Sequence, residues 1–335
     1  MWYNTGAGAT INDVRKDALS YKFKYTDALG YLTNYSIDSR YLDGMIYNKA
    51  GIERGFLNGN KIEVNFKSMY LNIADYQFNT SYLYDDFNSW NNTFNATFSH
   101  PYKYFKGNGS VKIDARASAF TSDFSYSWLG IEATNINRLG KTNLKSRFFA
   151  RAMGGSSIPF MSAMQLGGAN NEQMLESKYS RSRGIIPDDW ANFSNASGQF
   201  HMNGNLNLRG YSNYLATNNN EADTFYIFNG KNGTSVNLEW DFTQIFNLKM
   251  TKLARYIKLN TYLFTDAGML WNDQGNSGIR ADAGLGTMWN LQLPKLAKAE
   301  PLQVRVDFPI FLNRIPVGEE NYLAFRWQIG LQKAF

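Results

Sequence analysis

The chain lacks several features on which common protein functions depend. It contains no cysteine, which excludes disulfides and thiolate metal sites. Its two histidines, His100 and His201, lie far apart and have no acidic neighbour at ligand spacing, so we expect no bound metal. No apolar run approaches the roughly 18 residues that a transmembrane helix needs. Charged residues make up only 19% of the chain, and no basic run indicates nucleic-acid binding.

Catalytic patterns are equally scarce. The sequence shows no Ser/His/Asp set, no phosphate-binding loop and no paired catalytic carboxylates, so we expect neither enzymatic activity nor a cofactor. Gly284-Leu285-Gly286 is too short for a dinucleotide fingerprint, and a strand bend or a close backbone approach explains it better. Three i, i+2 charge pairs are expected to tune hydration on a polar strand face: Asp114/Arg116, Arg280/Asp282 and Arg305/Asp307.

Aromatic residues, by contrast, make up 16% of the chain, and they recur in an alternating pattern. Val111, Ile113 and Ala115 oppose Lys112 and Asp114, as in a strand with one apolar and one wet face. About fourteen such segments are expected, near residues 21–25, 31–37, 45–52, 62–66, 76–84, 94–98, 111–117, 124–128, 144–152, 233–243, 255–270, 278–291, 301–312 and 321–335. Pro309 falls within one of them and must occupy a bulge or a strand end.

Alternation of this kind predicts an all-β fold, a transmembrane antiparallel β-barrel of the outer-membrane type with about 14–16 strands. In such a barrel lipid-facing and lumen-facing residues alternate, so no single segment is strongly apolar. We expect residues 1–335 to form one barrel domain. The start of the chain has no basic region followed by an apolar core, so it is not a signal peptide, and we expect N-terminal domains of a longer precursor to be absent.

The alternating rhythm stops between residues 154 and 232. This interruption is far longer than an ordinary loop, and loops of this length are usually functional or disordered. It contains Leu208-Arg209-Gly210-Tyr211, and the next two strands place Glu239 and Asp266 on their polar faces. An Arg on a long loop, followed by two strand carboxylates that face one interior, predicts a loop folded into the lumen and held by charge. Alternatively, Arg209 lies on a solvated loop and the two acids are ordinary lumen residues.

These residues resemble a known family. Arg209-Gly210-Tyr211 is similar to the Arg-Gly-aromatic motif in the sixth extracellular loop of the outer-membrane insertase and two-partner-secretion superfamily, the bacterial surface antigen family. Phe264 to Gly268 resembles the Asp-x-Gly strand motif that holds that Arg, and Glu239 matches its second acidic partner. The resemblance covers about residues 199–335. Members with sixteen strands have five after this loop, which implies that two N-terminal strands are missing here or partly formed by residues 1–11.

The last segment also resembles the recognition signal of outer-membrane barrels. Trp327, Ile329 and Leu331 alternate toward Phe335, and Gly330 is a candidate kink at a first-to-last strand seam. Lys333 departs from this pattern, which prefers an apolar residue there. If the C-terminus is periplasmic, residues 154–232, 271–277 and 313–320 lie outside the cell.

What the resemblance implies is an outer-membrane barrel that inserts or translocates polypeptides, or that anchors or exports a fused N-terminal passenger such as a hydrolase. The implied partners are the bilayer with its lipopolysaccharide, a polypeptide client or passenger, and accessory lipoproteins. Two other classes stay open. A diffusion porin would need an open lumen, and a soluble lectin-like β-sandwich would stay in aqueous solution without detergent.

Overall fold

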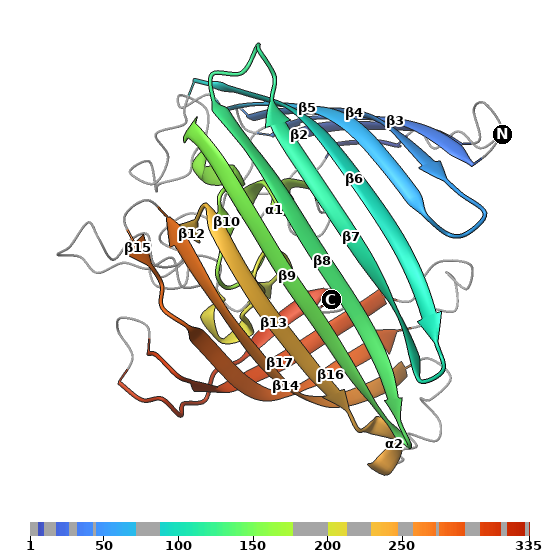
Figure 1. Ribbon diagram of the computed structural model, residues 1–335, viewed down its shortest axis with the longest axis vertical. Coiled ribbons are helices and arrows are strands. Elements are labelled where there is room, and N and C mark those ends of the chain that lie inside the picture. The colour runs from blue at the N-terminus through green and yellow to red at the C-terminus, as the bar shows by residue number, and fades with distance from the viewer. Residues whose placement is uncertain are drawn as a thin grey trace.

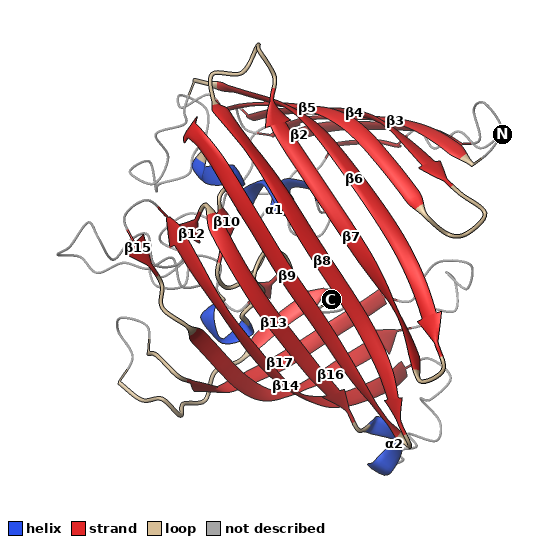
Figure 2. Ribbon diagram, viewed as in Figure 1, coloured by secondary structure: helices blue, strands red, loops and turns tan. Residues whose placement is uncertain are grey.

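The computed structural model describes residues 6–9, 18–26, 32–42, 45–71, 88–176, 200–212, 229–246, 257–272, 275–291, 302–315, 320–331 and 335. Long, tilted strands form one strongly curved sheet, and the short helices lie against it or at its ends (Figures 1 and 2). Within the described ranges, no helix is long and apolar enough to cross a membrane.

Nine strands precede the long loop: β1 (Gly6–Ala9), β2 (Ala18–Thr26), β3 (Thr33–Leu42), β4 (Met45–Gly55), β5 (Lys61–Leu71), β6 (Trp90–Tyr104), β7 (Gly107–Ser118), β8 (Ser125–Leu139) and β9 (Thr142–Ser157). Five long-sheet strands follow it: β13 (Asn232–Asp241), β14 (Ile257–Asn272), β16 (Arg280–Leu291), β17 (Leu302–Leu312) and β18 (Gln328–Leu331). The shorter elements are β10 (Met164–Gln165), β11 (Phe200–His201), β12 (Asn229–Gly230), β15 (Gly275–Asn276), α1 (Asn171–Glu176), α2 (Thr243–Phe246) and the 3-10 turns η2 (Phe160–Ser162) and η5 (Arg209–Tyr211).

The fourteen main strands pair antiparallel in chain order, with β9 joined directly to β13 across the long loop. Together with β15 and β11 they make a sheet of 16 strands. Sequence alternation therefore predicted the all-β fold and the five strands after the loop correctly. Among the described residues, no pairing joins β1 to β18. Instead β11, a loop segment, pairs parallel with β18.

The two faces of the sheet differ sharply in chemistry. On β13, Val236 and Trp240 are 44% and 42% exposed, whereas Asn237 and Glu239 are buried. Strand alternation produces this difference, because neighbouring side chains point to opposite faces. We call the face that carries the buried polar groups the inner face. An apolar exterior around a polar interior is the opposite of a soluble β-sandwich, and one continuous sheet excludes that alternative.

Several sequence expectations can be checked at single strands. Among the described residues of the segment 321–335, Gln328–Leu331 alone joins the ladder, and Leu323 makes one isolated bridge to Phe311, so residues 321–327 do not form the strand that was predicted. Hydrophobic alternation continued through residues whose backbone leaves the sheet. The segment 76–84 lies outside the described residues, while β1 supplies a strand within residues 1–11.

Proline and glycine positions behave as their chemistry requires. Pro309 pairs with Gly284 at a register shift, so the predicted bulge is present. A Cβ at Gly284 would lie 2.1 Å from the Phe308 carbonyl oxygen, which confirms the close backbone approach expected at this glycine.

Candidate functional site

The described part of the long loop lies against the inner face, and Arg209 is at the centre of its contacts. Its side chain is 0% exposed. Nη1 lies 2.7 Å from Glu239 Oε1, Nε lies 2.8 Å from Asp266 Oδ2, and Nη2 lies 2.9 Å from Asp266 Oδ1. The structure thus brings together the three charged residues singled out in the sequence. The Asp266 contact is bidentate, the geometry for which a planar guanidinium is suited.

Strand register explains why the two carboxylates converge on one guanidinium. β13 and β14 are neighbours in which Asn237 is opposite Asp266, and Glu239 lies two residues farther along the same face. Asn237 Nδ2 donates to Asp266 Oδ1 at 3.1 Å and fixes that carboxylate. The Phe264 ring lies 3.9 Å from the guanidinium carbon of Arg209 and covers one side of the cluster.

Burial alone would lower the pKa of Arg209, but Asp266 and Glu239 raise it well above its usual value. The guanidinium therefore stays charged wherever the barrel is folded. A buried cation with two anionic partners is a contact that costs more to break than it contributes when complete.

The residues next to Arg209 also contact the strands of the inner face closely. Gly210 N donates to Asp282 Oδ2 at 3.0 Å, and a Cβ at Gly210 would lie 2.4 Å from Leu312 Cδ2. The Tyr211 hydroxyl lies 2.9 Å from the Arg314 carbonyl oxygen. A Cβ at Gly268 would meet the Thr234 carbonyl oxygen at 2.7 Å. Only glycine lets the loop and strands approach this closely.

Asp282 belongs to the same cluster, although its spacing predicted only a local pairing with Arg280. It is opposite Asp266 in the ladder between β14 and β16, and it is 1% exposed. Its Oδ1 has no hydrogen-bond partner among the described residues. Two carboxylates therefore contact the guanidinium directly, and the carboxyl group of Asp282 binds the backbone of the next loop residue. Cross-strand pairing between distant segments created this arrangement, so local sequence spacing did not reveal it.

A second anchor holds the other end of the described loop, and sequence reasoning missed it. Glu172 of α1 is 2% exposed and accepts hydrogen bonds from Arg116 Nη1 at 2.7 Å, Lys67 Nζ at 2.9 Å and Ser162 Oγ at 2.7 Å. Glu176 also contacts Lys67. Burial alone would raise the pKa of the Glu172 carboxyl, but Arg116 and Lys67 hold it well below its usual value. Glu172 therefore stays anionic in its buried position.

This anchor corrects one of the local charge pairs. Arg116 does not pair with Asp114, two residues away, but with Glu172 in the loop. Asp114 instead accepts a hydrogen bond of 3.1 Å from Nη2 of Arg151, which lies on β9. The sequence did contain a signal, because Arg116 lay on a predicted polar strand face and Lys67 continues the alternation of the segment 62–66. Their partner could not be chosen without the path of the loop. The Arg305–Asp307 pair, by contrast, is present at 2.9 Å.

A third contact places the loop on the edge of the last strand. Phe200 and His201 pair parallel with Ile329 and Gly330. His201 is 1% exposed; its Nδ1 accepts a hydrogen bond from Arg305, and its Nε2 lies 3.1 Å from the Gly167 carbonyl oxygen. A Cβ at Gly330 would lie 2.7 Å from Arg305 Nη2, so this glycine makes room for Arg305.

The remaining C-terminal residues do not gather at this site. Ile329, Gly330 and Leu331 belong to β18, but Trp327 and Phe335 lie outside the ladder. Trp327 is 40% exposed. Within the described ranges, no cluster of three or more His, Asp or Glu side chains could hold a metal ion.

Comparison with solved structures bears on the fold. CdiB from Escherichia coli is similar over 93% of this chain, with a TM-score of 0.53 and 10% identity, and the match covers 53% of that chain. The fold is that of the CdiB β-barrel. BamA from Haemophilus ducreyi lacking POTRA domains 1–3 matches 98% of this chain and 74% of its own, with a TM-score of 0.46 and 11% identity. CdiB from Acinetobacter baumannii matches 97% of this chain and 58% of its own, at 0.40 and 11%.

At these identities the likeness concerns the fold alone. It confirms the fold that the superfamily resemblance of Arg209-Gly210-Tyr211 and Asp266 implied. The chain spans about half the length of the Escherichia coli CdiB chain. The sequence matches no protein-family model and no curated protein.

Proposed function

We propose that this chain spans a bacterial outer membrane as a β-barrel and acts in the insertion or translocation of polypeptides. The apolar outer face would contact the bilayer and its lipopolysaccharide, and a polypeptide client would engage the inner face or the terminal strand. The observation that supports this role most strongly is the loop itself. It contacts the inner face through ionic anchors instead of leaving a plain aqueous channel.

The anchors lie on strands that are far apart in the sheet. Glu172 binds β5 and β7, whereas Arg209 binds β13 and β14. The loop therefore ties the N-terminal strands to the C-terminal strands through the interior. A plain diffusion porin would need an open lumen, whereas these ion pairs hold the loop against the inner face. A conduit for polypeptides, in contrast, needs a seal that can move.

The terminal strand is the second functional element in this proposal. β18 forms a ladder with β17 on one side and with the loop segment β11 on the other. Backbone groups at the edge of a strand add further strands readily. We infer that Phe200–His201 covers this edge and has to leave before β1 or a client strand can pair there. Handling of a fused passenger or of accessory lipoproteins remains a prediction of the sequence resemblance.

Reconstitution tests the proposal directly. The purified chain in liposomes is mixed with an unfolded β-barrel client diluted from urea, and client folding is followed by its shift in gel mobility. We expect client folding to be faster than in empty liposomes. Conductance in planar bilayers provides the second readout. Small irregular steps support a plugged barrel, whereas large steady ohmic steps without any effect on the client would assign a porin.

A further inference from the structure

Three neighbouring turns at one end of the barrel carry an unusual concentration of positive charge. They join β4 to β5, β6 to β7 and β8 to β9, which are consecutive strands of the sheet. The surrounding stretches 54–62, 99–112 and 135–146 contain no Asp or Glu. They contain eight cationic residues: Arg54, Lys61, Lys103, Lys106, Lys112, Arg138, Lys141 and Lys145. We call these three turns with their flanking residues the basic rim.

Most of these cationic side chains are exposed to solvent. Lys106 and Lys141 are at the turns themselves, and both are exposed. Among the described residues, neither forms an ion pair with a carboxylate. Two other cations do have carboxylate partners: Lys145, itself part of the basic rim, reaches Glu239 at 3.2 Å, and Lys49 reaches Glu63 at 2.8 Å. Among the described residues, Lys106 and Lys141 therefore lack the carboxylate partners that Lys145 and Lys49 have.

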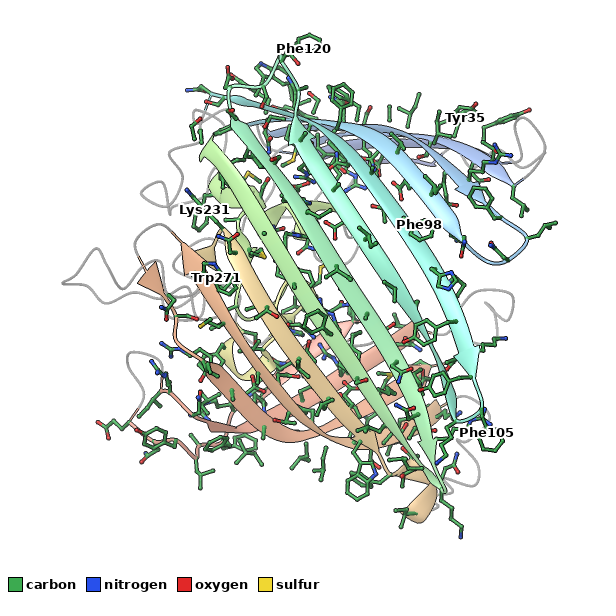
Figure 3. The ribbon with its side chains drawn as sticks, viewed as in Figure 1. Tyr35, Phe98, Phe105, Phe120, Lys231 and Trp271 are labelled. Carbon is green, nitrogen blue, oxygen red and sulfur yellow. The ribbon has the colours of Figure 1, made fainter. Side chains whose placement is uncertain are left out.

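Apolar side chains project from the same turns. Leu57 is 101% exposed, Phe105 is 99% exposed and Leu139 is 51% exposed. They continue the apolar outer face, where Ile62, Phe98 and Ile136 are between 37% and 41% exposed. Figure 3 shows Phe98 partway along β6 and Phe105 at the end of the same hairpin. The basic rim thus begins where the apolar band of the barrel ends.

We propose that the basic rim binds the headgroups of anionic glycerophospholipids in the leaflet at this end of the barrel. This inference rests on the proposed membrane location and on no particular client. At the edge of the apolar band, the flanking side chains lie at headgroup depth. Lysine suits this site because its apolar stem can follow the hydrocarbon boundary while its ammonium group reaches a phosphate. The exposed apolar tips can enter the acyl region beside it.

The topology selects one leaflet. The turns of the basic rim lie at the end opposite the connection between β9 and β13, which is the long loop. If that loop is extracellular, the basic rim faces the periplasmic leaflet, where glycerophospholipids and not lipopolysaccharide supply the phosphates. An acidic protein segment would match the charge but has no use for fully exposed apolar tips beside the apolar band.

Lipid titration of the full chain tests this proposal. The protein in neutral detergent is titrated with dioleoylphosphatidylglycerol or dioleoylphosphatidylcholine, and bound lipid is counted by native mass spectrometry. We expect phosphatidylglycerol to bind at least about tenfold more tightly, because each cation near an anionic surface contributes several-fold. The double variant Lys106→Gln/Lys141→Gln should lose about tenfold of this affinity. The matched control Lys231→Gln/Arg314→Gln removes two cations at the opposite end and should lose none.

Three outcomes would overturn the proposal. Equal binding of the two lipids removes its basis. Equal loss in both double variants would show a general effect of net charge. Displacement of phosphatidylglycerol by a poly-glutamate peptide at equal charge concentration would assign the basic rim to an acidic polypeptide. A barrel that inserts and accelerates client folding but shows any of these results refutes the basic rim alone. Lipid preference without client folding refutes the proposed function alone.

Discussion

Arg209 carries the contact on which the inner position of the loop depends. Its guanidinium is shared between Glu239 and Asp266, and its neighbour Gly210 donates a backbone hydrogen bond to Asp282. Among the described residues, removing the guanidinium leaves the buried Asp266 without its cation and leaves Glu239 with Lys145 alone. Because an uncompensated buried charge is more costly than a lost surface ion pair, the effect should be large.

Arg209→Ala should therefore weaken the fold by about 3–5 kcal/mol and release this end of the loop. We expect a lower urea midpoint of unfolding and larger, more frequent conductance steps in planar bilayers. Arg209→Lys should have a midpoint between those of the wild type and Arg209→Ala, since it keeps the charge but loses the bidentate contact. Lys141→Ala, an exposed cation in the turn between β8 and β9, serves as the control and should keep the wild-type midpoint. An unchanged midpoint in Arg209→Ala would show that the ion pairs of Arg209 do not hold the loop.

The Glu172 anchor should respond to pH in a defined direction. Its pKa is held well below the ordinary value in the folded protein, so the group adds stability above the unfolded pKa of about 4.3. That stability is lost only as the pH falls through the lower folded pKa. Acidification from pH 7 to pH 5 should therefore leave the anchor in place.

A spin label at Phe160→Cys, in a chain that has no other cysteine, reports this release. The spectrum should be unchanged between pH 7 and pH 5 and should gain a mobile component below about pH 4. In a Glu172→Gln background the mobile component should already be present at pH 7. The same label in an Arg209→Ala background separates the two anchors. A mobile component that appears near pH 6 would assign the release to another group.

At the scale of elements, the parallel contact between β11 and β18 is the most unusual pairing in the sheet. Main strands of this barrel pair antiparallel, and β1 would also have to approach β18 antiparallel. The loop segment therefore occupies the edge in an orientation that a barrel strand would not adopt. The hydrogen bond that His201 accepts from Arg305 of β17 stabilises this position of the loop segment. We interpret this pairing as a removable cover for the edge.

The double variant Phe200→Cys/Ile329→Cys tests that interpretation, because these residues are opposite each other in the ladder. Oxidation should form a disulfide and slow client folding, and reduction should restore the rate. Val306→Cys/Ile329→Cys is the matched control, since it bonds β18 to β17 without involving the loop. It should form a disulfide and leave the client rate unchanged. Inhibition in the control alone, or no inhibition in the loop variant, would show that the cover does not have to move.

At the scale of the whole molecule, apolar and polar residues are inverted relative to a soluble protein. Leu129 and Leu263 are 61% and 44% exposed, whereas Asp266 and Arg305 are nearly completely buried. Such a surface is stable only against hydrocarbon, because exposed apolar patches of this extent aggregate in water. The barrel should stay folded in mild detergent and precipitate when the detergent is removed.

Gel mobility provides the corresponding measurement. The unheated chain in sodium dodecyl sulfate should migrate differently from the boiled chain, because a long hydrogen-bonded sheet resists the detergent until it is heated. Circular dichroism of both samples supplies the control for strand content. A monodisperse protein in buffer without detergent would contradict the membrane assignment.

Local patterns alone determined the faces of this protein. Alternation through β7 and β13 specified which side chains are apolar and which are polar, because side chains of a strand alternate by geometry. The interruption at 154–232 and the motif at Arg209 identified the loop and its anchor in the same way. Alternation failed for residues 321–327, where the backbone leaves the ladder although the pattern continues.

Only the tertiary structure determined which charged side chains pair with one another. Arg116 could have paired with Asp114 by spacing, yet it binds Glu172, and Asp282 joined the Arg209 cluster through strand register. The parallel position of Phe200–His201 on β18 also had no local signature. A charged side chain can pair with any opposite charge that lies near it. The path of the long loop across the curved sheet determines which opposite charge that is. That path depends on contacts between residues far apart in the chain, which sequence spacing does not encode.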